Sequence, residues 1–285
     1  MNKYKSLLII TLALLATWSL RELFFRDLSN KDKDDKDTVS DYKTERVQAF
    51  SLSGFSESGK KIWEVEGKSA DILGDIINLW DIDADSYQDD VTVNLKSDEG
   101  VFDRRNNNLE LKTNVIIITD EGSTLRTDSL CWNAKEENIS TEDYVYITRQ
   151  DMDIEGVGAS ADPDLKIAQL NKNVRVDTKD PMAVITCDGT LKLDYDNNIA
   201  YFYENVKLDD GKSIITTDEA TAYFDPEKRT FKKIVCVGNV DIRRGEDSTQ
   251  ADKLTYIPGE GRVILTGRPK IIIRSTEELL KDKAF

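Results

Sequence analysis

The chain has 285 residues, 33% of them charged, and its formal net charge is −15. Recognition of phosphate requires a basic surface, so this balance excludes nucleic acid as a partner and argues against docking on an anionic membrane surface. The sequence also contains no histidine. Catalysis by serine–histidine or cysteine–histidine pairs is therefore excluded, and we expect neither a cofactor nor a metal ion.

Residues 1–27 have the features of an N-terminal membrane anchor. Lys3 and Lys5 precede an apolar stretch that runs from residue 7 to residue 20. The stretch suits the core of a signal peptide, but no Ala-x-Ala cleavage site follows it. An uncleaved single-pass anchor is therefore favoured over a cleaved signal. The lysines keep the N-terminus in the cytoplasm, so the rest of the chain is expected outside the cytoplasm.

Residues 28–46 predict a flexible stalk. They are dense in charge and nearly free of apolar side chains. Such a segment cannot bury enough surface to offset the entropy of ordering it. The folded part of the chain is expected to begin near Gln48.

A unit of about thirty residues recurs from residue 98 onward. Each unit opens on an aspartate, and successive spacings are 30, 34, 26, 30 and 34 residues. A second recurring position follows the aspartate within the unit. It holds a β-branched residue, usually preceded by Asn. This period predicts a repetitive architecture in which neighbouring units complete each other's core. The aspartates are Asp98, Asp128, Asp162, Asp188, Asp218 and Asp252, and the second recurring positions are Asn114-Val115, Val145, Asn173-Val174, Asn205-Val206 and Asn239-Val240.

The turn-forming residues between these recurring positions predict an all-β fold. Turn-forming clusters recur about every fifteen residues, with segments rich in Val, Ile, Thr, Tyr and Phe between them. Short turns join antiparallel strands, so each unit is expected to hold two antiparallel strands. The sequence DTKDP at 177–181 interrupts the pattern. We therefore predict a first domain at 47–178, a second at 182–274 and a C-terminal tail at 275–285.

The repeated aspartates are interpreted as turn residues whose side chains bond their own backbone, because a catalytic pair of carboxylates would occur only once. A D-x-D-x-D sequence at Asp81, Asp83 and Asp85 lacks the glycine and the closing glutamate of a calcium loop. The three cysteines, Cys131, Cys187 and Cys236, are interpreted as small buried residues. A disulfide bond between Cys187 and Cys236 is an alternative that the sequence does not decide.

Several short motifs, in their order, resemble the lipopolysaccharide-transport bridge proteins. The first half is similar to the LptC family in an anchor followed by FSLSGF (50–55), GKKIWEV (59–65), DEGVFD (98–103) and LELKTNV (109–115). The second half is similar to the OstA/LptA family in TDEA (217–220), GNV (238–240), QAD (250–252) and LTGRP (265–269). The family usually has these parts as separate chains, whereas here they are joined.

This resemblance implies a twisted antiparallel β-jelly roll, two stacked sheets with an open-edged groove that holds lipopolysaccharide acyl chains. It implies a single-pass anchor in the bacterial inner membrane, a periplasmic main domain and no enzymatic activity. The expected partners are lipopolysaccharide, an ABC transporter at the anchor and N-terminal edge, and another bridge subunit or outer-membrane translocon at the C-terminal strand, 270–274.

Fifteen apolar or aromatic residues are candidates for the lipid-facing surface. The same side chains would pack together in a structural or adhesive repeat protein with a closed core, which is the alternative function. A second alternative is a membrane-anchored polysaccharide hydrolase that uses carboxylates. The candidates are Phe102, Leu109, Leu111, Val115, Ile117, Leu130, Trp132, Val145, Leu191, Leu193, Tyr195, Val206, Tyr223, Val240 and Tyr256.

Overall fold

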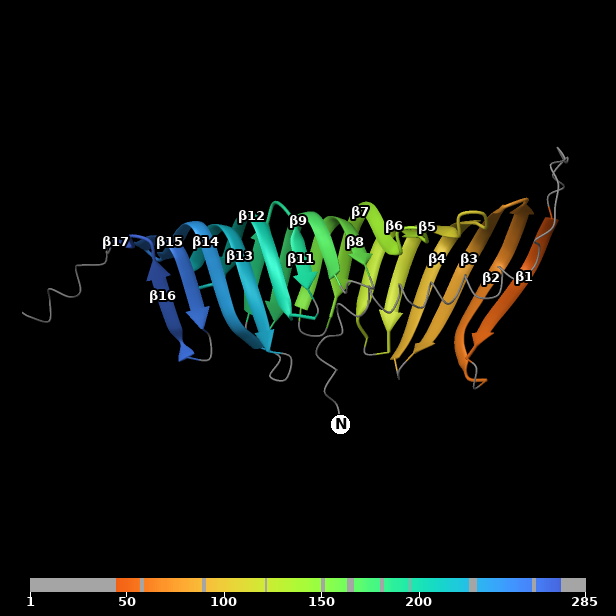
Figure 1. Ribbon diagram of the computed structural model, residues 1–285, viewed down its shortest axis with the longest axis horizontal. Helices are drawn as coiled ribbons and strands as arrows, with labels where there is room; N and C mark the ends of the chain where they lie inside the picture. Colours follow the sequence, from red (N-terminus) through yellow and green to blue (C-terminus); the bar gives the residue numbers. More distant parts are fainter. Residues whose placement is uncertain are drawn as a thin grey trace, which may run out of the picture. The chain divides into compact units, whose positions relative to one another are not determined.

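The structure is a computed structural model, and its described residues form seventeen β-strands and no α-helix (Figure 1). Among these residues there is also no helix with the length and hydropathy that crossing a membrane requires. The predicted anchor, most of the predicted stalk and the predicted tail lie outside the described residues. The described residues are 45–56, 59–88, 91–120, 122–149, 152–162, 167–179, 182–194, 196–225, 230–257 and 260–272.

Two compact units divide the described chain. The N-terminal unit contains the residues up to 149 together with 157–162 and 167–168, and the C-terminal unit contains 152–156 and 169–272. Strands β8 (Met152–Asp162) and β9 (Ile167–Lys179) therefore contribute residues to both units. The domain boundaries expected from the sequence stay a prediction.

In the N-terminal unit, seven strands pair in chain order, each antiparallel to the next. Hairpin connections of a few residues allow this arrangement, as the regular turn clusters predict. The strands are β1 (Glu45–Phe55), β2 (Lys61–Leu73), β3 (Ile76–Gln88), β4 (Val91–Asp103), β5 (Asn108–Thr119), β6 (Thr124–Asn133) and β7 (Asn138–Thr148).

In the C-terminal unit, β9 pairs with β10, and both β10 and β11 pair with β12. Antiparallel pairing continues through β15, which pairs with both β16 and β17. The strands are β10 (Met182–Cys187), β11 (Leu191–Asp194), β12 (Ile199–Asp209), β13 (Ile214–Asp225), β14 (Thr230–Arg244), β15 (Asp247–Ile257), β16 (Arg262–Thr266) and β17 (Lys270–Ile272).

A two-residue bulge interrupts β5, β12 and β14 near the middle of each strand. At each one the register shifts, so that two residues of the bulged strand face one residue of a neighbour. Both bulge residues have positive φ, a conformation that bends the strand and increases its twist. The bulges are Thr113 (64°) and Asn114 (55°), Glu204 (65°) and Asn205 (51°), and Gly238 (84°) and Asn239 (46°).

The second residue of each bulge is an asparagine, which tolerates the left-handed conformation better than most residues. Its side-chain amide donates a hydrogen bond to one of the periodic aspartates. The pairs are Asn114 with Asp98 at 2.6 Å, Asn205 with Asp188 at 2.8 Å, and Asn239 with Asp218 at 3.0 Å. In these three repeats the aspartate and the asparagine therefore belong to one contact, in which a carboxylate from a preceding segment bonds the bend of a neighbouring strand.

This arrangement corrects the expected role of the aspartates as turn residues, which is wrong for four of the six. Asp98 lies inside β4, Asp128 inside β6, Asp218 inside β13 and Asp252 inside β15. The periodicity records where strands bend rather than where the chain reverses.

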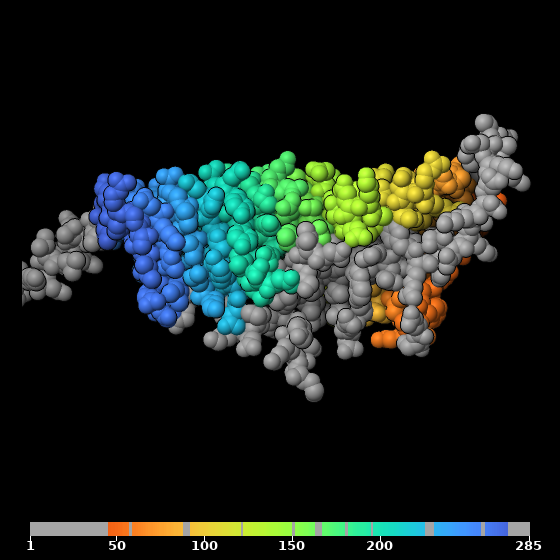
Figure 2. Space-filling view, viewed as in Figure 1, coloured from red at the N-terminus to blue at the C-terminus, as the bar shows by residue number. Residues whose placement is uncertain are grey.

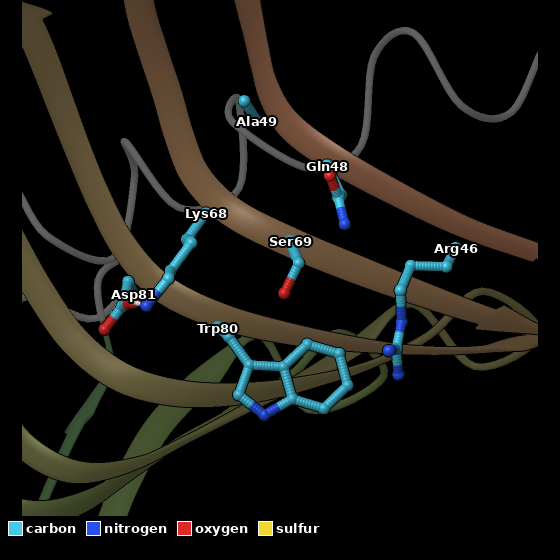
Figure 3. A pocket seen from close by; sticks show the side chains of 7 residues that line it. All are labelled: Arg46, Gln48, Ala49, Lys68, Ser69, Trp80 and Asp81. Atoms are coloured by element: carbon cyan, nitrogen blue, oxygen red, sulfur yellow. Dashed lines mark ion pairs between the residues drawn. The ribbon is translucent and has the colours of Figure 1, made fainter.

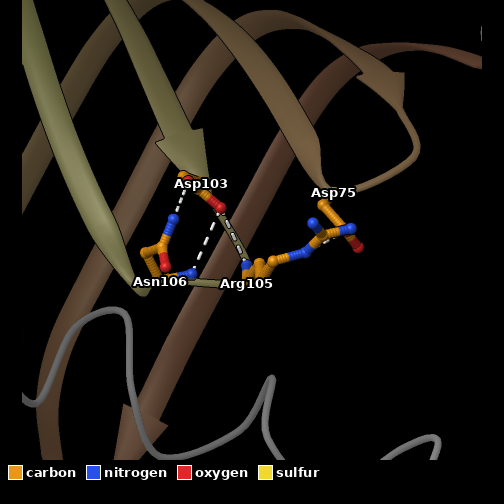
Figure 4. Close-up of polar contacts among 4 residues, drawn as sticks. All are labelled: Asp75, Asp103, Arg105 and Asn106. Atoms are coloured by element: carbon orange, nitrogen blue, oxygen red, sulfur yellow. Dashed lines mark hydrogen bonds and ion pairs between the residues drawn. The ribbon is translucent and has the colours of Figure 1, made fainter.

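The turn role belongs to other residues, such as Asp103 at the β4–β5 turn (Figure 4). Its carboxylate accepts hydrogen bonds from the backbone N–H groups of Arg105 (2.9 Å) and Asn106 (3.2 Å), and from the Asn106 side chain (2.6 Å). These bonds lower the pKa of Asp103. Arg105 reaches the β2–β3 turn, where its guanidinium pairs with Asp75 at 2.7 Å. Asp194 and Asn197 repeat this local pattern at the β11–β12 turn.

A buried hydroxyl stands immediately before several of the periodic aspartates. The Thr217 hydroxyl lies 3.0 Å from the carbonyl oxygens of both Val237 and Gly238, and the Ser97 hydroxyl lies 2.9 Å from that of Lys112. These carbonyls sit where a bulge breaks the ladder of strand hydrogen bonds. A buried carbonyl without a donor is unfavourable, so the hydroxyl replaces the missing ladder bond.

The β-branched residue of each repeat anchors the core, and in β5, β12 and β14 it directly follows the bulge. Val115, Val145, Val174, Val206 and Val240 are all fully buried. The change of direction also explains why the hydrophobic alternation looks imperfect in the sequence. In β4, positions 93, 95 and 97 are buried before the bend, and positions 100 and 102 are buried after it. A period of two is kept on either side and shifted by one residue in between.

The fold starts slightly earlier than the sequence predicts. β1 begins at Glu45, so the last two residues assigned to the stalk belong to a strand. Arg46 forms a bidentate ion pair with Asp71 of β2, at 2.6 and 2.7 Å. The guanidinium lowers the pKa of Asp71 through these hydrogen bonds. A partner 25 residues away in sequence is what orders this charged segment.

We predict that Gly238→Ala destabilises the C-terminal unit by about 3 kcal/mol, because φ is left-handed there and a β-carbon would overlap the Asp218 carboxylate. Gly211→Ala is the matched control. It has a similar φ of 76° but open space around it, so only about 1 kcal/mol should be lost. Urea-induced unfolding measures both. In an Asp218→Ala background the Gly238→Ala loss should shrink, and an unchanged loss would contradict the steric explanation.

We also predict that Thr217→Val destabilises the fold by about 2 kcal/mol, since it leaves buried bulge carbonyls without a donor at nearly constant volume. Thr217→Ser retains the hydroxyl and should lose less. Thr216→Val, at the exposed neighbouring position, should be close to neutral. The melting temperatures of the three variants, measured by thermal unfolding, test this prediction. Equal effects of Thr217→Val and Thr216→Val would contradict the assignment.

Candidate functional site

Most of the predicted lipid-facing residues lie in the interior of the two units. Eleven of the fifteen are buried, and Leu193, Tyr223 and Tyr256 are half-buried. Tyr195 lies outside the described residues. The buried ones are Phe102, Leu109, Leu111, Val115, Ile117, Leu130, Trp132, Val145, Leu191, Val206 and Val240.

In the N-terminal unit, strand register aligns these side chains into rows that cross several strands. One row runs through Phe102, Leu109, Trp132 and Ile139, from β4 to β7. Directly opposed residues of antiparallel strands have their side chains on the same face and in contact. A continuous apolar stripe therefore crosses the sheet at a right angle to its strands.

A longer stripe crosses the same unit on the other side of the bulges. It passes from Val65 through Ala84, Leu95 and Ile117 to Leu125. All five residues are buried. The unit therefore has two apolar stripes, one on each side of the line along which its strands bend.

The C-terminal unit contains an equivalent stripe. It passes from Leu191 through Phe202, Ala220 and Cys236 to Leu254. A second stripe combines two buried alanines with three half-buried residues. It consists of Leu193, Ala200, Ala222, Ile234 and Tyr256. The space-filling view shows the strands of this unit as a continuous surface on the face in view, in agreement with the burial of these side chains (Figure 2).

Tyr223 lies on the opposite face of β13 from Ala220 and Ala222. Its ring lies under the ammonium of Lys233, at 4.1 Å from the ring centroid, and both residues are half-buried. We therefore leave Tyr223 out of the proposed lipid-facing set.

Several members of these stripes were absent from the sequence prediction. Ile139, Phe202 and Leu254 are examples, each buried and directly opposed to a stripe residue. Their apolar character is plain in the sequence. The register between strands assigns these residues to one face of the sheet. A shift of the register by one residue would move them to the other face.

The cysteines are free thiols in the structure. Cys187 and Cys236 are buried, as interpreted from the sequence, and Cys131 is half-buried. Burial raises the pKa of Cys187 to about 11 and that of Cys236 to about 12. Both therefore remain protonated at neutral pH and behave as small apolar residues of the core.

The acidic D-x-D-x-D segment is held in local pairs on the surface of β3. Asp81 pairs with Lys68 at 3.3 Å, and Asp83 pairs with Lys96 at 2.8 Å. The Asn94 amide lies 2.6 Å from Asp83 and 2.9 Å from Asp85. Within the described part of the chain, no group of three or more cysteine, aspartate or glutamate side chains is arranged to hold a metal ion.

The outermost strands of the units carry exposed apolar side chains. β1 exposes Leu52 (51%) and Phe55 (56%), and Figure 1 shows it at the end of the N-terminal unit. β16 and β17 are outermost in the C-terminal unit, where Val263 is 52% and Ile271 63% exposed. Proteins usually protect terminal strands with charge or cover, so these edges are suited to pairing with another chain.

Comparisons with known proteins find two family models that match successive parts of the chain. Residues 6–179 match the family model "Lipopolysaccharide-assembly, LptC-related", and residues 185–279 match "LptA/(LptD N-terminal domain) LPS transport protein". No curated protein matches the chain. Among solved structures, the chain is similar to the crystal structure of LptH, the LptA homologous periplasmic component of the lipopolysaccharide transport device of Pseudomonas aeruginosa. That match has 10% identity and a TM-score of 0.24 and covers 54% of this chain and 96% of that one.

The LptC-related match alone spans more than half of the chain, and the LptA-like match follows it directly. Both families are transport proteins rather than enzymes. The chain therefore belongs to the LptC-related lipopolysaccharide-assembly family, with an LptA-like segment joined to it, and is a component of the periplasmic lipopolysaccharide transport bridge.

Proposed function

We propose that this chain is anchored in the inner membrane by residues 1–27 and passes lipopolysaccharide acyl chains along its interior towards the outer membrane. The single observation that carries the proposal is the succession of an LptC-related and an LptA-like match in one chain. The fold supports it, since both matched segments are built of antiparallel strands with apolar stripes on one face.

The stripes supply the proposed lipid-facing surface. Apolar contact stabilises by about 25 cal/mol per Å² of area removed from water, without demanding a particular geometry. Acyl chains can therefore exchange with side-chain contacts along a stripe at little net change in free energy. Because the stripe residues are buried, lipid entry requires the parts of the sheet that cover them to separate. The resulting groove is that of a β-jelly roll with open edges.

Passive holding of acyl tails is consistent with the charge of the chain. Lipid A is anionic, whereas the protein has a net charge of −15 and no clustered basic sequence. The phosphorylated sugars would then remain in solvent while the tails are bound. The chain has no phosphate-binding loop, so we assign the energy source to an ABC transporter that contacts the anchor and the β1 edge.

The terminal strands are the proposed docking edges. A partner strand added to β1 or β17 would gain main-chain hydrogen bonds and cover the exposed Leu52 or Ile271. The β1 edge is assigned to the inner-membrane partner because it lies nearest the anchor in sequence. The β16–β17 edge is assigned to another bridge subunit or to the outer-membrane translocon.

We predict that a small aliphatic photo-crosslinker at Leu111 or Leu193 becomes linked to lipopolysaccharide in cells. Leu193 belongs to a stripe, and the buried Leu111 lies two residues from Leu109, on the same face of β5. The matched controls are Glu110 and Lys192, which precede them on the opposite face of the same strands. These positions should give no lipid adduct. Absence of lipid adducts at all four positions would favour the alternative of a repeat protein with a closed core.

We further predict that a crosslinker at Ile271 captures another transport component and one at Leu52 captures a transporter subunit. Met182 is a stringent control, because it is 79% exposed, more than either test position, but belongs to β10 rather than to a proposed edge. Mass spectrometry of the adducts identifies the partners. Equal capture at Met182 would show that exposure alone explains the adducts.

A further inference from the structure

A cavity of about 580 Å³ lies on the surface of β1, β2 and β3 and plays no part in the proposed acyl path (Figure 3). Its volume is in the range of sites for small molecules. The residues that line it are Arg46, Gln48, Ala49, Lys68, Ser69, Trp80 and Asp81.

The cavity opens on the face of the sheet opposite the apolar stripes. Gln48 opposes Ser69, and Ser69 opposes Trp80, so the three side chains share one face of β1, β2 and β3. The adjacent pair, Ala70 and Leu79, faces the other way and is buried. Trp80 is half-buried and Gln48 is exposed. The row is therefore accessible from outside while the interior remains packed.

The chemistry of the row is that of an aromatic platform bordered by hydrogen-bonding groups. Figure 3 shows the Trp80 indole below Ser69 and Gln48, with Arg46 on one side and Lys68 with Asp81 on the other. An amide, a hydroxyl and an indole N–H together offer donors and acceptors around an apolar ring face. This combination matches a pyranose ring, which presents C–H groups on its faces and hydroxyls around its rim.

Charge at the cavity favours an uncharged ligand. Arg46 is held by Asp71 in a bidentate pair, and the lowered pKa of Asp71 keeps that pair ionised into the acid range. Lys68 is offset by Asp81 at 3.3 Å. The cations are thus balanced by carboxylates, and the net charge of −15 adds no attraction for an anion. Spare guanidinium donors of Arg46 remain for neutral oxygens.

The backbone around the cavity is also unusual for this chain. Ala49 and Asp81 border it with φ of 55° and 50°. Each of the three bulges described above includes an Asn in this conformation whose side chain bonds an aspartate, whereas Ala49 has no polar side chain to stabilise it, at a cost of about 1–2 kcal/mol. Strain retained at a defined position often accompanies a binding site. Here the positive-φ residues Ala49 and Asp81 are themselves part of the cavity lining.

We propose that this outward cavity binds the ring of a neutral saccharide, stacked on Trp80 and hydrogen-bonded by Gln48 and Ser69. The saccharide comes either from the sugar portion of the transported lipid or from a cell-wall glycan. The proposal does not depend on the acyl path, since the cavity and the stripes lie on opposite faces of β2 and β3.

Calorimetry on the full chain tests it, in a detergent without a sugar headgroup so that the detergent cannot compete. The probes are chitotetraose, a neutral oligosaccharide fragment of lipopolysaccharide that carries no phosphate, and inorganic phosphate. Binding of either saccharide is expected and identifies its source. Binding of phosphate alone, or of none of the probes, would overturn the proposal.

Variants locate the binding. Trp80→Ala should weaken saccharide binding about tenfold and Ser69→Ala about threefold, while Trp80→Phe should retain part of the affinity. Tyr144→Ala, at an aromatic residue 49% exposed on β7, should change nothing. Melting temperatures show whether each variant is folded. Saccharide affinity that survives Trp80→Ala in a folded protein would overturn the site. Lipid adducts at Leu111 in that variant report separately on the proposed function.

Discussion

The contact between a carboxylate and a left-handed bulge is the interaction on which the rest of the structure depends. A long antiparallel strand left to its own twist would carry its inward side chains along a single gradual curve. Here Asp218 holds Asn239, and the Thr217 hydroxyl caps the carbonyls that the bulge releases. The bend is thus specified by polar groups, and apolar residues on both sides of it are brought to the same interior.

The repetition of that contact explains why the two units can differ in sequence and remain alike in construction. In three repeats, one of them in the N-terminal unit and two in the C-terminal unit, a carboxylate of a preceding segment bonds the bend residue of a strand, and a β-branched residue follows the bulge. Val115 in the N-terminal unit and Val206 in the C-terminal unit fill that space with no exposed surface. At the remaining positions of a strand, only the choice between an apolar inward side chain and a polar outward one has to be kept. The size of the side chains in a stripe can therefore vary.

The Asp–Asn contact at the bulges also explains which parts of the fold could be predicted from the sequence. The period, the all-β class and the strand segments could be recognised because turns and β-branched residues are local signals. The function of the aspartates was not local, since Asp98 bonds a residue 16 positions away. The face of Tyr223 is not a local signal either, since it follows from the alternation of β13 with the buried Ala220 and Ala222. The sequence favours a core or groove-wall position for Trp80, although an aromatic residue on a strand does not reveal its face.

An interior defined by bends rather than by close interlocking of large side chains is well matched to a conduit. Ala220 and Ala222 occupy stripe positions in β13, opposite Cys236 and Ile234 of β14. Small and unbranched side chains give up little packing when an acyl chain replaces a neighbour, whereas the polar contacts at each bend remain formed. Opening of the interior would then proceed about the line of bulges, with the Asp–Asn pairs unbroken. In the proposed function, the polar residues at the bends would stabilise the fold, while the small apolar residues of the same strands would let acyl chains bind and leave.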